Sequence, residues 1–178
     1  MYDVIAKTNG VENIEIPLKS DFSIDKNEIL KLSSSSIKIL FLCSPNNPTG
    51  NSFDTNDLTD LIKDFNGVVV VDEAYIDFSS KQSLISLIND NNNLIITQTM
   101  SKAYGMAGIR LGMGFSNQKI INYLNKIKPP YNINVLTERK ALEELNKIDE
   151  FKKNIDLVLN QRNLLVCLLY TSDAADEG

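Results

Sequence analysis

Four consecutive valines, Val68–Val71, constrain the fold of this chain more than any other feature. β-Branched side chains favour strands, and a run without polar interruptions is typical of a strand that is covered on both faces. Three further stretches read as strands: Ile37–Cys43, Leu94–Thr97 and Ile109–Phe115. Because helical patterns separate these strands, crossover connections are expected between them. The sequence therefore predicts an α/β fold with a mostly parallel sheet flanked by helices.

Amphipathic periodicity and capping residues mark the expected helices. Asp25 is a candidate N-cap for a helix that ends at Leu32, and Asp54 or Thr55 can cap the helix that precedes the valines. The opening residues read as a helix that closes near Gly10. The other expected elements are a short strand at Ile14–Ile16 and helices after Ser116 or Asn117, over Val135–Leu145 and over Asp149–Val166.

Composition sets limits on the kind of protein. The chain has 178 residues, which is room for about one domain, and 43% of them are hydrophobic, which is enough to bury a core. The formal charge of −5 comes without a basic patch or a block of like charge, so neither nucleic acid nor an interaction tail is indicated. The sequence has no apolar stretch of membrane-spanning length, and its opening residues do not follow the pattern of a secretory signal. We therefore expect a cytoplasmic protein.

Metal chemistry is not indicated either. Histidine is absent, which excludes histidine-based triads and histidine metal ligands within this chain. The two cysteines, Cys43 and Cys167, lack the spacing of metal ligands. Cys43 ends a predicted strand and reads as a small buried hydrophobe. We therefore expect no metal site.

Both ends of the chain read as cut. A helix that is already under way at Tyr2 suggests an internal piece of a longer protein. The residues from Cys167 to Glu177 match the translation of a common transposon-end sequencing adaptor, and the alternative is a frayed native C-terminus. The expected organisation is a partial domain over residues 1–166, truncated at both ends, followed by a non-native tail over residues 167–178.

Polar segments follow three of the predicted strands. They are Ser44–Gly50, Asp72–Tyr75 and Thr99–Arg110. The carboxyl ends of parallel strands lie at one edge of a sheet, and ligands gather there. Three such segments in this order indicate one shared site far more strongly than any one of them alone.

Lys102 has the setting of a lysine that holds an aldehyde. Its amine must lose a proton before it can attack a carbonyl carbon, and burial beside cationic groups favours that loss. The hydroxyls of Thr99 and Ser101 and the forked guanidinium of Arg110 suit the oxygens of a phosphate. Because Arg110 stands between apolar residues of an expected strand, its expected partner is a buried anion. The alternatives are a solvated lysine, hydroxyls that cap a strand end, and an arginine in a surface ion pair.

Asp72 closes the valine run, so it is expected to be sheltered and to need a cation or hydrogen-bond donors. A protonated pyridine nitrogen would serve, and that pair would keep the ring electron-poor and able to stabilise a carbanion. Tyr75 and Asn47 could bind a phenolic oxygen of the same ring. Alternatively, Asp72 caps the segment that begins at Glu73. Tyr75 would then be a half-buried aromatic residue and Asn47 part of a simple turn.

These three segments resemble the motifs of a known enzyme family. Ser44–Gly50, Asp72–Ser79 and Thr99–Gly112 resemble the motifs of fold-type I aminotransferases, which use pyridoxal 5′-phosphate. Within that group the chain is most similar to the histidinol-phosphate aminotransferase family. The resemblance covers nearly all of residues 1–166, and its general motifs are more specific than its substrate assignment. It implies the large, cofactor-binding domain of a transaminase of histidine biosynthesis, which moves an amino group between glutamate and imidazole acetol phosphate.

The resemblance also implies a role for each candidate residue. Lys102 would hold the cofactor as a Schiff base and shuttle the proton of the substrate α-carbon. Asp72 would pair with the pyridine nitrogen of the cofactor. Tyr75 and Asn47 would bind the phenolic oxygen of its ring. The residues implied at the phosphate are Thr99, Ser101 and Arg110.

Family members are homodimers with the site at the subunit interface, and this sequence omits several of their parts. It lacks an upstream glycine-containing phosphate loop, an aromatic residue that stacks on the ring, and a small C-terminal domain with an arginine for the substrate carboxylate. We expect the chain as written to be inactive, although its parent would be an enzyme.

Other functions on this scaffold fit the same motifs. A threonine-phosphate decarboxylase and an aromatic amino-acid aminotransferase share them, and a non-enzymatic alternative is a fragment that has lost catalysis. The joint presence of Asp72, Lys102 and Arg110 argues against such decay.

Overall fold

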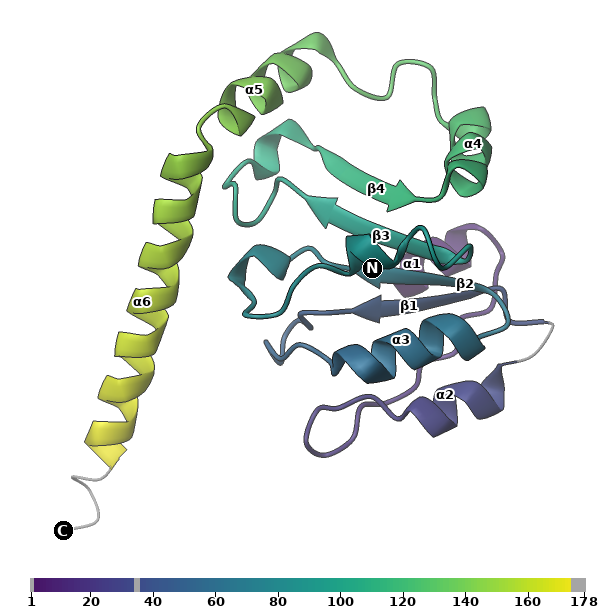
Figure 1. Ribbon diagram of the computed structural model, residues 1–178, viewed down its shortest axis with the longest axis horizontal. Coiled ribbons are helices and arrows are strands. Elements are labelled where there is room, and N and C mark those ends of the chain that lie inside the picture. The colour runs from purple at the N-terminus through teal and green to yellow at the C-terminus, as the bar shows by residue number, and fades with distance from the viewer. Residues whose placement is uncertain (1, 34–35, 174–178) are drawn as a thin grey trace.

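The computed structural model describes residues 2–33 and 36–173 of the chain, as a four-stranded sheet with helices on both of its faces (Figure 1). The α-helices and strands, in chain order, are α1 (Tyr2–Thr8), α2 (Lys26–Leu32), β1 (Ile39–Cys43), α3 (Thr55–Asp64), β2 (Val68–Asp72), β3 (Leu94–Thr99), β4 (Gly112–Ser116), α4 (Gln118–Ile127), α5 (Val135–Leu145) and α6 (Ile148–Asp173). The short 3-10 helices are η1 (Ile76–Phe78), η2 (Leu84–Leu87) and η3 (Ala107–Ile109).

The sheet has the order β1-β2-β3-β4, and its register brings the polar strand ends together. β1, β2 and β3 are parallel, whereas β4 runs antiparallel to β3. Cys43 of β1 lies opposite Asp72 of β2, and Asp72 lies opposite Thr97 of β3. The predicted α/β fold with a mostly parallel sheet is confirmed, and the three polar segments do start from one edge of it.

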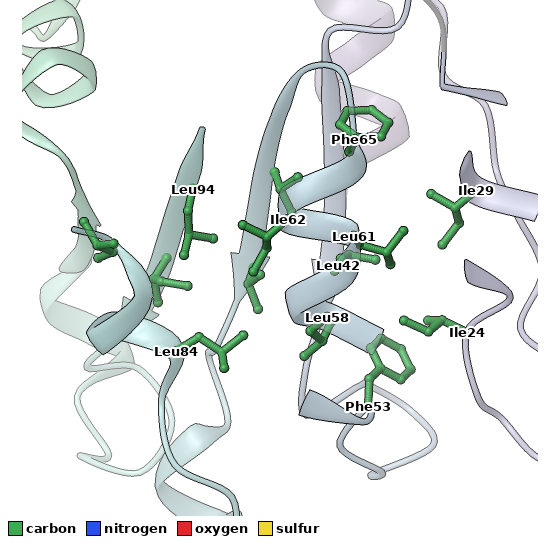
Figure 2. Close-up of a cluster of buried hydrophobic side chains, with 14 residues drawn as sticks. Ile24, Ile29, Leu42, Phe53, Leu58, Leu61, Ile62, Phe65, Leu84 and Leu94 are labelled. Atoms are coloured by element: carbon green, nitrogen blue, oxygen red, sulfur yellow. The ribbon is translucent and has the colours of Figure 1, made fainter. Parts of the chain in front are cut away.

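The core lies between the sheet and the helices α2 and α3 (Figure 2). Alternate residues of a strand point to opposite faces, so every second residue of β2 and β3 faces these helices. In α3 the residues spaced three and four apart form the matching apolar stripe. The buried side chains at this interface include Leu42, Leu58, Leu61, Ile62, Val69, Val71, Leu94 and Ile96.

The opposite face of the sheet is covered less completely. The ring of Tyr2, in α1, stacks on Phe41 of β1 with the ring centroids 4.5 Å apart. Ile39 and Phe41 nevertheless keep 51% and 45% of their surface exposed. Asp72 belongs to this more open face, because it follows Val71 of the buried face by one residue.

Side-chain caps begin the helices where the sequence predicted them. Asp25 accepts a hydrogen bond from a backbone N–H of α2, and Asp54 accepts two from the first turn of α3. Asn117 accepts two from the first turn of α4, which decides between the two candidates there. Such caps satisfy N–H groups that have no partner inside the helix. They fix where each helix starts, and hence where the preceding loop ends.

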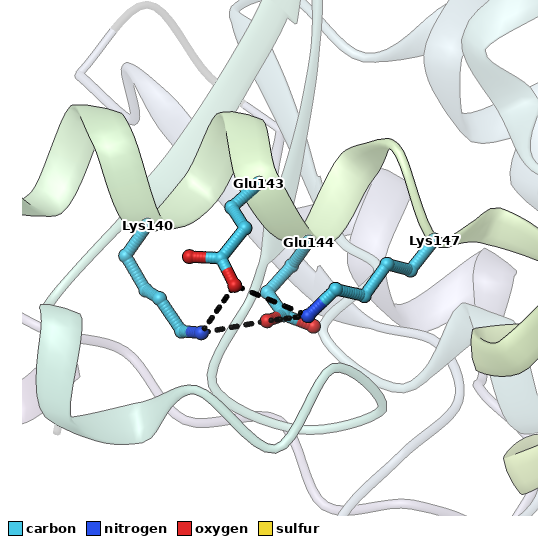
Figure 3. Close-up of polar contacts among 4 residues, drawn as sticks. All are labelled: Lys140, Glu143, Glu144 and Lys147. Atoms are coloured by element: carbon cyan, nitrogen blue, oxygen red, sulfur yellow. Dashed lines mark hydrogen bonds and ion pairs between the residues drawn. The ribbon is translucent and has the colours of Figure 1, made fainter.

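Four charges on α5 and the turn after it form a surface network (Figure 3). Lys140 and Lys147 each pair with both Glu143 and Glu144, at distances between 2.7 and 3.3 Å. Water and salt screen pairs of this kind, so the network adds little to stability. We interpret it as a solvated surface rather than as a binding site.

Helix α6 extends away from the sheet but touches the loops at its edge (Figure 1). The ring of Phe151 in α6 stacks on Tyr104, with the centroids 3.9 Å apart. The helix also packs against η1. The expected end of the native chain at Val166 falls inside α6, which continues to Asp173, while residues 174–178 of the predicted tail lie outside the described residues.

Two predicted strands begin later in the structure than expected, and one predicted strand is absent among the described residues. The segment Ile14–Ile16 belongs to no helix or strand, because a strand needs a hydrogen-bonded neighbour and the structure gives this segment none among the described residues. β1 begins at Ile39, two residues later than predicted. β4 begins at Gly112, because Ile109 and the two residues after it form the end of a loop.

Candidate active site

The loop after β1 and the loop after β2 are joined by hydrogen bonds, one of which brings together two predicted site residues. The side-chain amide of Asn47 donates to the hydroxyl of Tyr75 over 2.9 Å. Asn47 is held in its loop by the neighbouring Asn46, whose backbone accepts from Gly50 and donates to Asn51. The contact joins residues 28 positions apart, and both side chains reach solvent. The predicted convergence of Asn47 and Tyr75 is therefore present in the structure.

Lys102 adds a cation to this pair from the loop after β3. Its ammonium nitrogen lies 5.1 Å from the centroid of the Tyr75 ring. A cation at this distance is attracted by the ring face. The carbonyl oxygen of Lys102 accepts a hydrogen bond from Gly105, whose φ of +66° is a conformation that glycine adopts without a Cβ clash. The turn thus presents Lys102 to the same polar patch as Asn47 and Tyr75.

Asp72 ends β2, three residues before Tyr75, and both of its carboxylate oxygens have donors. Oδ1 accepts from the backbone N–H of Ala74 over 3.1 Å, and Oδ2 accepts from the hydroxyl of Tyr2. The bond to Ala74 is a local one of the kind that the capping alternative predicted. The bond to Tyr2 is not local, because it spans 70 residues. The carboxylate is half-buried, as a sheltered acid with partners should be.

Thr99 ends β3, and Ser101 lies in the loop that carries Lys102. The hydroxyl of Thr99 accepts from the backbone N–H of Ser101 over 3.1 Å and donates to the carbonyl of Leu111 over 3.3 Å. The bond from Ser101 caps the end of the strand, as expected if the Thr99 hydroxyl serves the backbone and not a phosphate. The role of the two hydroxyls at a phosphate stays a prediction.

The expected setting of Arg110 is wrong. Arg110 is exposed, not sheltered within a strand, and it adopts a left-handed conformation with φ of 54° at the end of η3. The reason is that the segment folds back on itself: Met100 donates its N–H to the carbonyl of Leu111, and Met106 donates to that of Met100. With Met100 buried, this loop takes up the residues that the pattern assigned to a strand. The guanidinium donates to the carbonyl of Ala107 over 3.1 Å, so it needs no buried anion, and its role at a phosphate stays a prediction.

The residues that gather here suit an aldehyde with a polar aromatic ring. An amine, a phenol and an amide meet at Lys102, Tyr75 and Asn47, and a carboxylate stands three residues from the phenol. An amine can bond an aldehyde carbon, the phenol and amide can bind a ring oxygen, and a carboxylate can pair with a protonated ring nitrogen. The donor set therefore fits pyridoxal 5′-phosphate.

Sequence reasoning missed Tyr2 as a neighbour of the site. Its hydroxyl donates to Asp72 and accepts from the thiol of Cys43, with Sγ and the hydroxyl oxygen 3.6 Å apart. Burial raises the pKa of the Tyr2 phenol far above its usual value, and the bond to Asp72 raises it further. Burial likewise raises the pKa of the Cys43 thiol. No local pattern could have signalled Tyr2, because its partners lie 41 and 70 residues away.

Glu73 was missed as well, and it faces away from the site. Its carboxylate is 2% exposed. It accepts hydrogen bonds from the Ser83 hydroxyl at 2.6 Å, the Leu84 N–H at 2.8 Å and the Gln98 amide at 3.0 Å. These bonds tie the end of β2 to η2 and β3, so they support the edge on which the site is built.

Residues 2–33 and 36–173 have neither of two features that would bear on function. Within them, histidine, cysteine and acidic side chains form no group of three suited to a metal ion. None of the helices in these ranges combines the length and hydropathy that a membrane span needs.

The fold is an α/β fold, and a lysine, a carboxylate, a phenol and an amide lie at the carboxyl edge of its parallel strands. Together they are typical of a protein that binds a cofactor. The family model described as aminotransferase class I and II matches residues 1–174, so the chain belongs to this family. The resemblance to aminotransferases is thereby confirmed.

Within this family, the chain is similar to relatives named histidinol-phosphate aminotransferase. Histidinol-phosphate aminotransferase from Flavobacterium johnsoniae is 51% identical over 169 residues, which is 95% of this chain and 48% of that protein. The chain thus spans about half the length of the curated relatives it matches.

Solved structures share the fold. Histidinol-phosphate aminotransferase from Clostridium acetobutylicum has a TM-score of 0.86 at 24% identity, covering 96% of this chain and 52% of that one. The enzyme from Sinorhizobium meliloti, solved in complex with pyridoxal-5′-phosphate, has a TM-score of 0.83 at 23% identity, covering 91% and 45%. At these identities the likeness concerns the fold alone.

Proposed function

We propose that the protein containing this chain is a pyridoxal-phosphate-dependent aminotransferase that moves an amino group between glutamate and imidazole acetol phosphate, giving histidinol phosphate. Membership of the aminotransferase class I and II family supports the reaction class, and the name of a relative that is 51% identical supports the substrate. The observation that carries the proposal is the meeting of Lys102 with Tyr75 and Asn47 at the sheet edge where β2 ends in Asp72.

Each side chain has a task in this proposal. The amine of Lys102 holds the aldehyde carbon of the cofactor and then carries the proton of the substrate α-carbon. The carboxylate of Asp72 pairs with the protonated ring nitrogen, while Tyr75 and Asn47 bind the ring oxygen. The bound cofactor supplies an electron-poor ring that stabilises negative charge at that carbon. The proposed phosphate ligands are Thr99, Ser101 and Arg110.

The proposal extends to where the protein acts and with what. Its partners are small amino and keto acids, and the full protein forms a homodimer, as the family resemblance implies. We place it in the cytoplasm, as expected from the sequence pattern. The acidic composition, with a formal charge of −5, supports partners other than nucleic acid.

Borohydride trapping tests the role of Lys102. The full-length protein is incubated with pyridoxal 5′-phosphate, reduced, digested and mapped by mass spectrometry. The label is expected on Lys102, and the yellow protein is expected to bleach with glutamate. In Lys102→Ala, transamination should fall by about 10²–10⁴-fold or more, since proton transfer alone is worth that much. Lys126→Ala is the matched control, because Lys126 lies on the surface of α4. A label elsewhere would overturn the assignment.

Product analysis separates the two enzyme alternatives. The full-length protein is given histidinol phosphate with 2-oxoglutarate, an aromatic amino acid with 2-oxoglutarate, or threonine phosphate alone. The proposal predicts glutamate formation with histidinol phosphate as the preferred donor. Release of carbon dioxide from threonine phosphate would instead support the decarboxylase, and a preference for the aromatic donor would support the aromatic aminotransferase.

A further inference from the structure

Tyr2 sits where it can control the carboxylate of Asp72. Its hydroxyl donates to Oδ2, while the backbone N–H of Ala74 donates to Oδ1. The two donors approach different oxygens, so together they fix the plane of the carboxylate. Tyr2 is therefore placed to affect the orientation of Asp72.

The hydroxyl of Tyr2 is itself held in place. The Tyr2 ring stacks on Phe41 with an angle of 26° between the ring planes, and the next strand residue but one, Cys43, has its thiol 3.6 Å from the hydroxyl oxygen. The thiol is the donor in that contact, so the hydroxyl oxygen is used as an acceptor and its own hydrogen is directed at Asp72. Because burial raises the pKa of both Tyr2 and Cys43, both groups stay protonated at neutral pH and keep these donor roles.

We propose that Tyr2 is a positioning residue, whose hydroxyl bond to Asp72 keeps that carboxylate oriented toward the ring nitrogen of the bound cofactor. This inference rests on the proposed function, since it takes Asp72 as the partner of that nitrogen. A carboxylate whose plane is fixed by two donors meets a ring nitrogen without first having to reorient.

The test is Tyr2→Phe in the full-length holoenzyme, which keeps the ring on Phe41 and removes only the hydroxyl. The probe is pyridoxal 5′-phosphate labelled with ¹⁵N in its ring. Without the donor, one oxygen of Asp72 is no longer held in place, and the carboxylate can turn away from the ring nitrogen. The ¹⁵N resonance should therefore move toward the position of unprotonated pyridine. The cofactor dissociation constant should rise about tenfold, as expected when a hydrogen bond to a charged group is lost.

Two companion proteins separate this role from simple packing. Replacing Tyr2 with 4-aminophenylalanine keeps the ring and a weaker donor, and should give a ¹⁵N shift between those of the wild type and Tyr2→Phe. It also carries the test if Tyr2→Phe does not fold. Tyr123→Phe removes an exposed hydroxyl from α4 and should leave the resonance unchanged.

The possible outcomes are distinct. If the wild type takes up cofactor on Lys102 but the ¹⁵N resonance is the same in all four proteins, the inference about Tyr2 is overturned and the proposed function stands. An equal shift in Tyr123→Phe and Tyr2→Phe would also overturn it. If the wild type binds no cofactor, the proposed function fails and the inference fails with it.

Discussion

Asp72 and Glu73 are adjacent in the sequence, but their carboxylates lie in different surroundings. Successive strand residues point to opposite faces. Asp72 faces the more open side with Tyr2, whereas Glu73 enters the core and is 2% exposed. Asp72 ends β2 and Glu73 follows it directly, but only Asp72 lies on the more open face of the sheet. Glu73 instead holds the elements that carry the site.

We expect Glu73→Gln to destabilise the folded protein by about 1–3 kcal/mol, because a buried carboxylate with three donors is replaced by an amide that cannot accept all three bonds. Urea unfolding of the full-length protein, followed by circular dichroism, measures the change. Glu12→Gln removes an exposed carboxylate and serves as the control, with a change within about 0.5 kcal/mol. Equal stability of the two variants would contradict the structural role of Glu73.

At this scale the sequence predicts contacts that depend on strand ends and misses those that depend on distant segments. Asn47 and Tyr75 follow neighbouring strands, so their meeting was predictable. Tyr2 could not be assigned to Asp72, since nothing in a local pattern relates residues 70 apart. Arg110 was misplaced because an apolar neighbour on each side fits a strand and also fits the end of a packed loop.

Helix α3 shows why elements with strong local signals are predictable. Its N-cap, Asp54, and its apolar stripe both come from neighbouring residues in the sequence, and the helix begins at Thr55 as expected. Ile14–Ile16 has the alternation of a strand but no partner, and alternation alone cannot supply one. A helix can therefore be predicted from its own cap and apolar stripe. A strand cannot be predicted from its own residues alone, because it also needs a hydrogen-bonded neighbouring strand.

The cap of α3 gives a pH prediction. Backbone N–H groups of Asn56 and Asp57 donate to Asp54 and hold the pKa of its carboxyl below the usual value. A folded pKa below the unfolded one stabilises the protein above the unfolded pKa, at about 3.9, and this contribution is lost as the pH falls through the folded pKa. Asp54→Ala should lower the Tm at pH 7 and lower it much less near pH 2, as measured by calorimetry.

Asp54→Asn is the matched control for this prediction. Asparagine caps helices about as well as aspartate but does not titrate. It should keep most of the Tm at pH 7 and remove the contribution of this residue to acid sensitivity. If Asp54→Ala lowered the Tm equally at both pH values, the charge on Asp54 would not be the source of the stabilisation.

For the molecule as a whole, alternating strands and helices sufficed to predict the parallel part of the sheet. They could not predict that β4 turns back antiparallel to β3, because strand patterns carry no direction and the connecting loop is closed by its own hydrogen bonds. The site follows from the parallel part, since its polar loops leave the carboxyl ends of β1, β2 and β3.

We expect the 178-residue polypeptide, expressed alone, to show no transamination of histidinol phosphate with 2-oxoglutarate. The chain spans about half the length of the relatives it matches, and a substrate site needs groups that hold the substrate carboxylate and phosphate as well as the cofactor. A coupled assay for glutamate compares it with the full-length protein at equal concentration. Turnover near that of the full-length protein would contradict this expectation.

The stack of Phe151 on Tyr104 anchors the long helix α6 to the loop that carries Lys102. Tyr104 is two residues from Lys102, and η1, which α6 also touches, begins right after Tyr75. One helix outside the sheet therefore braces both of the loops from which the amine and the phenol extend.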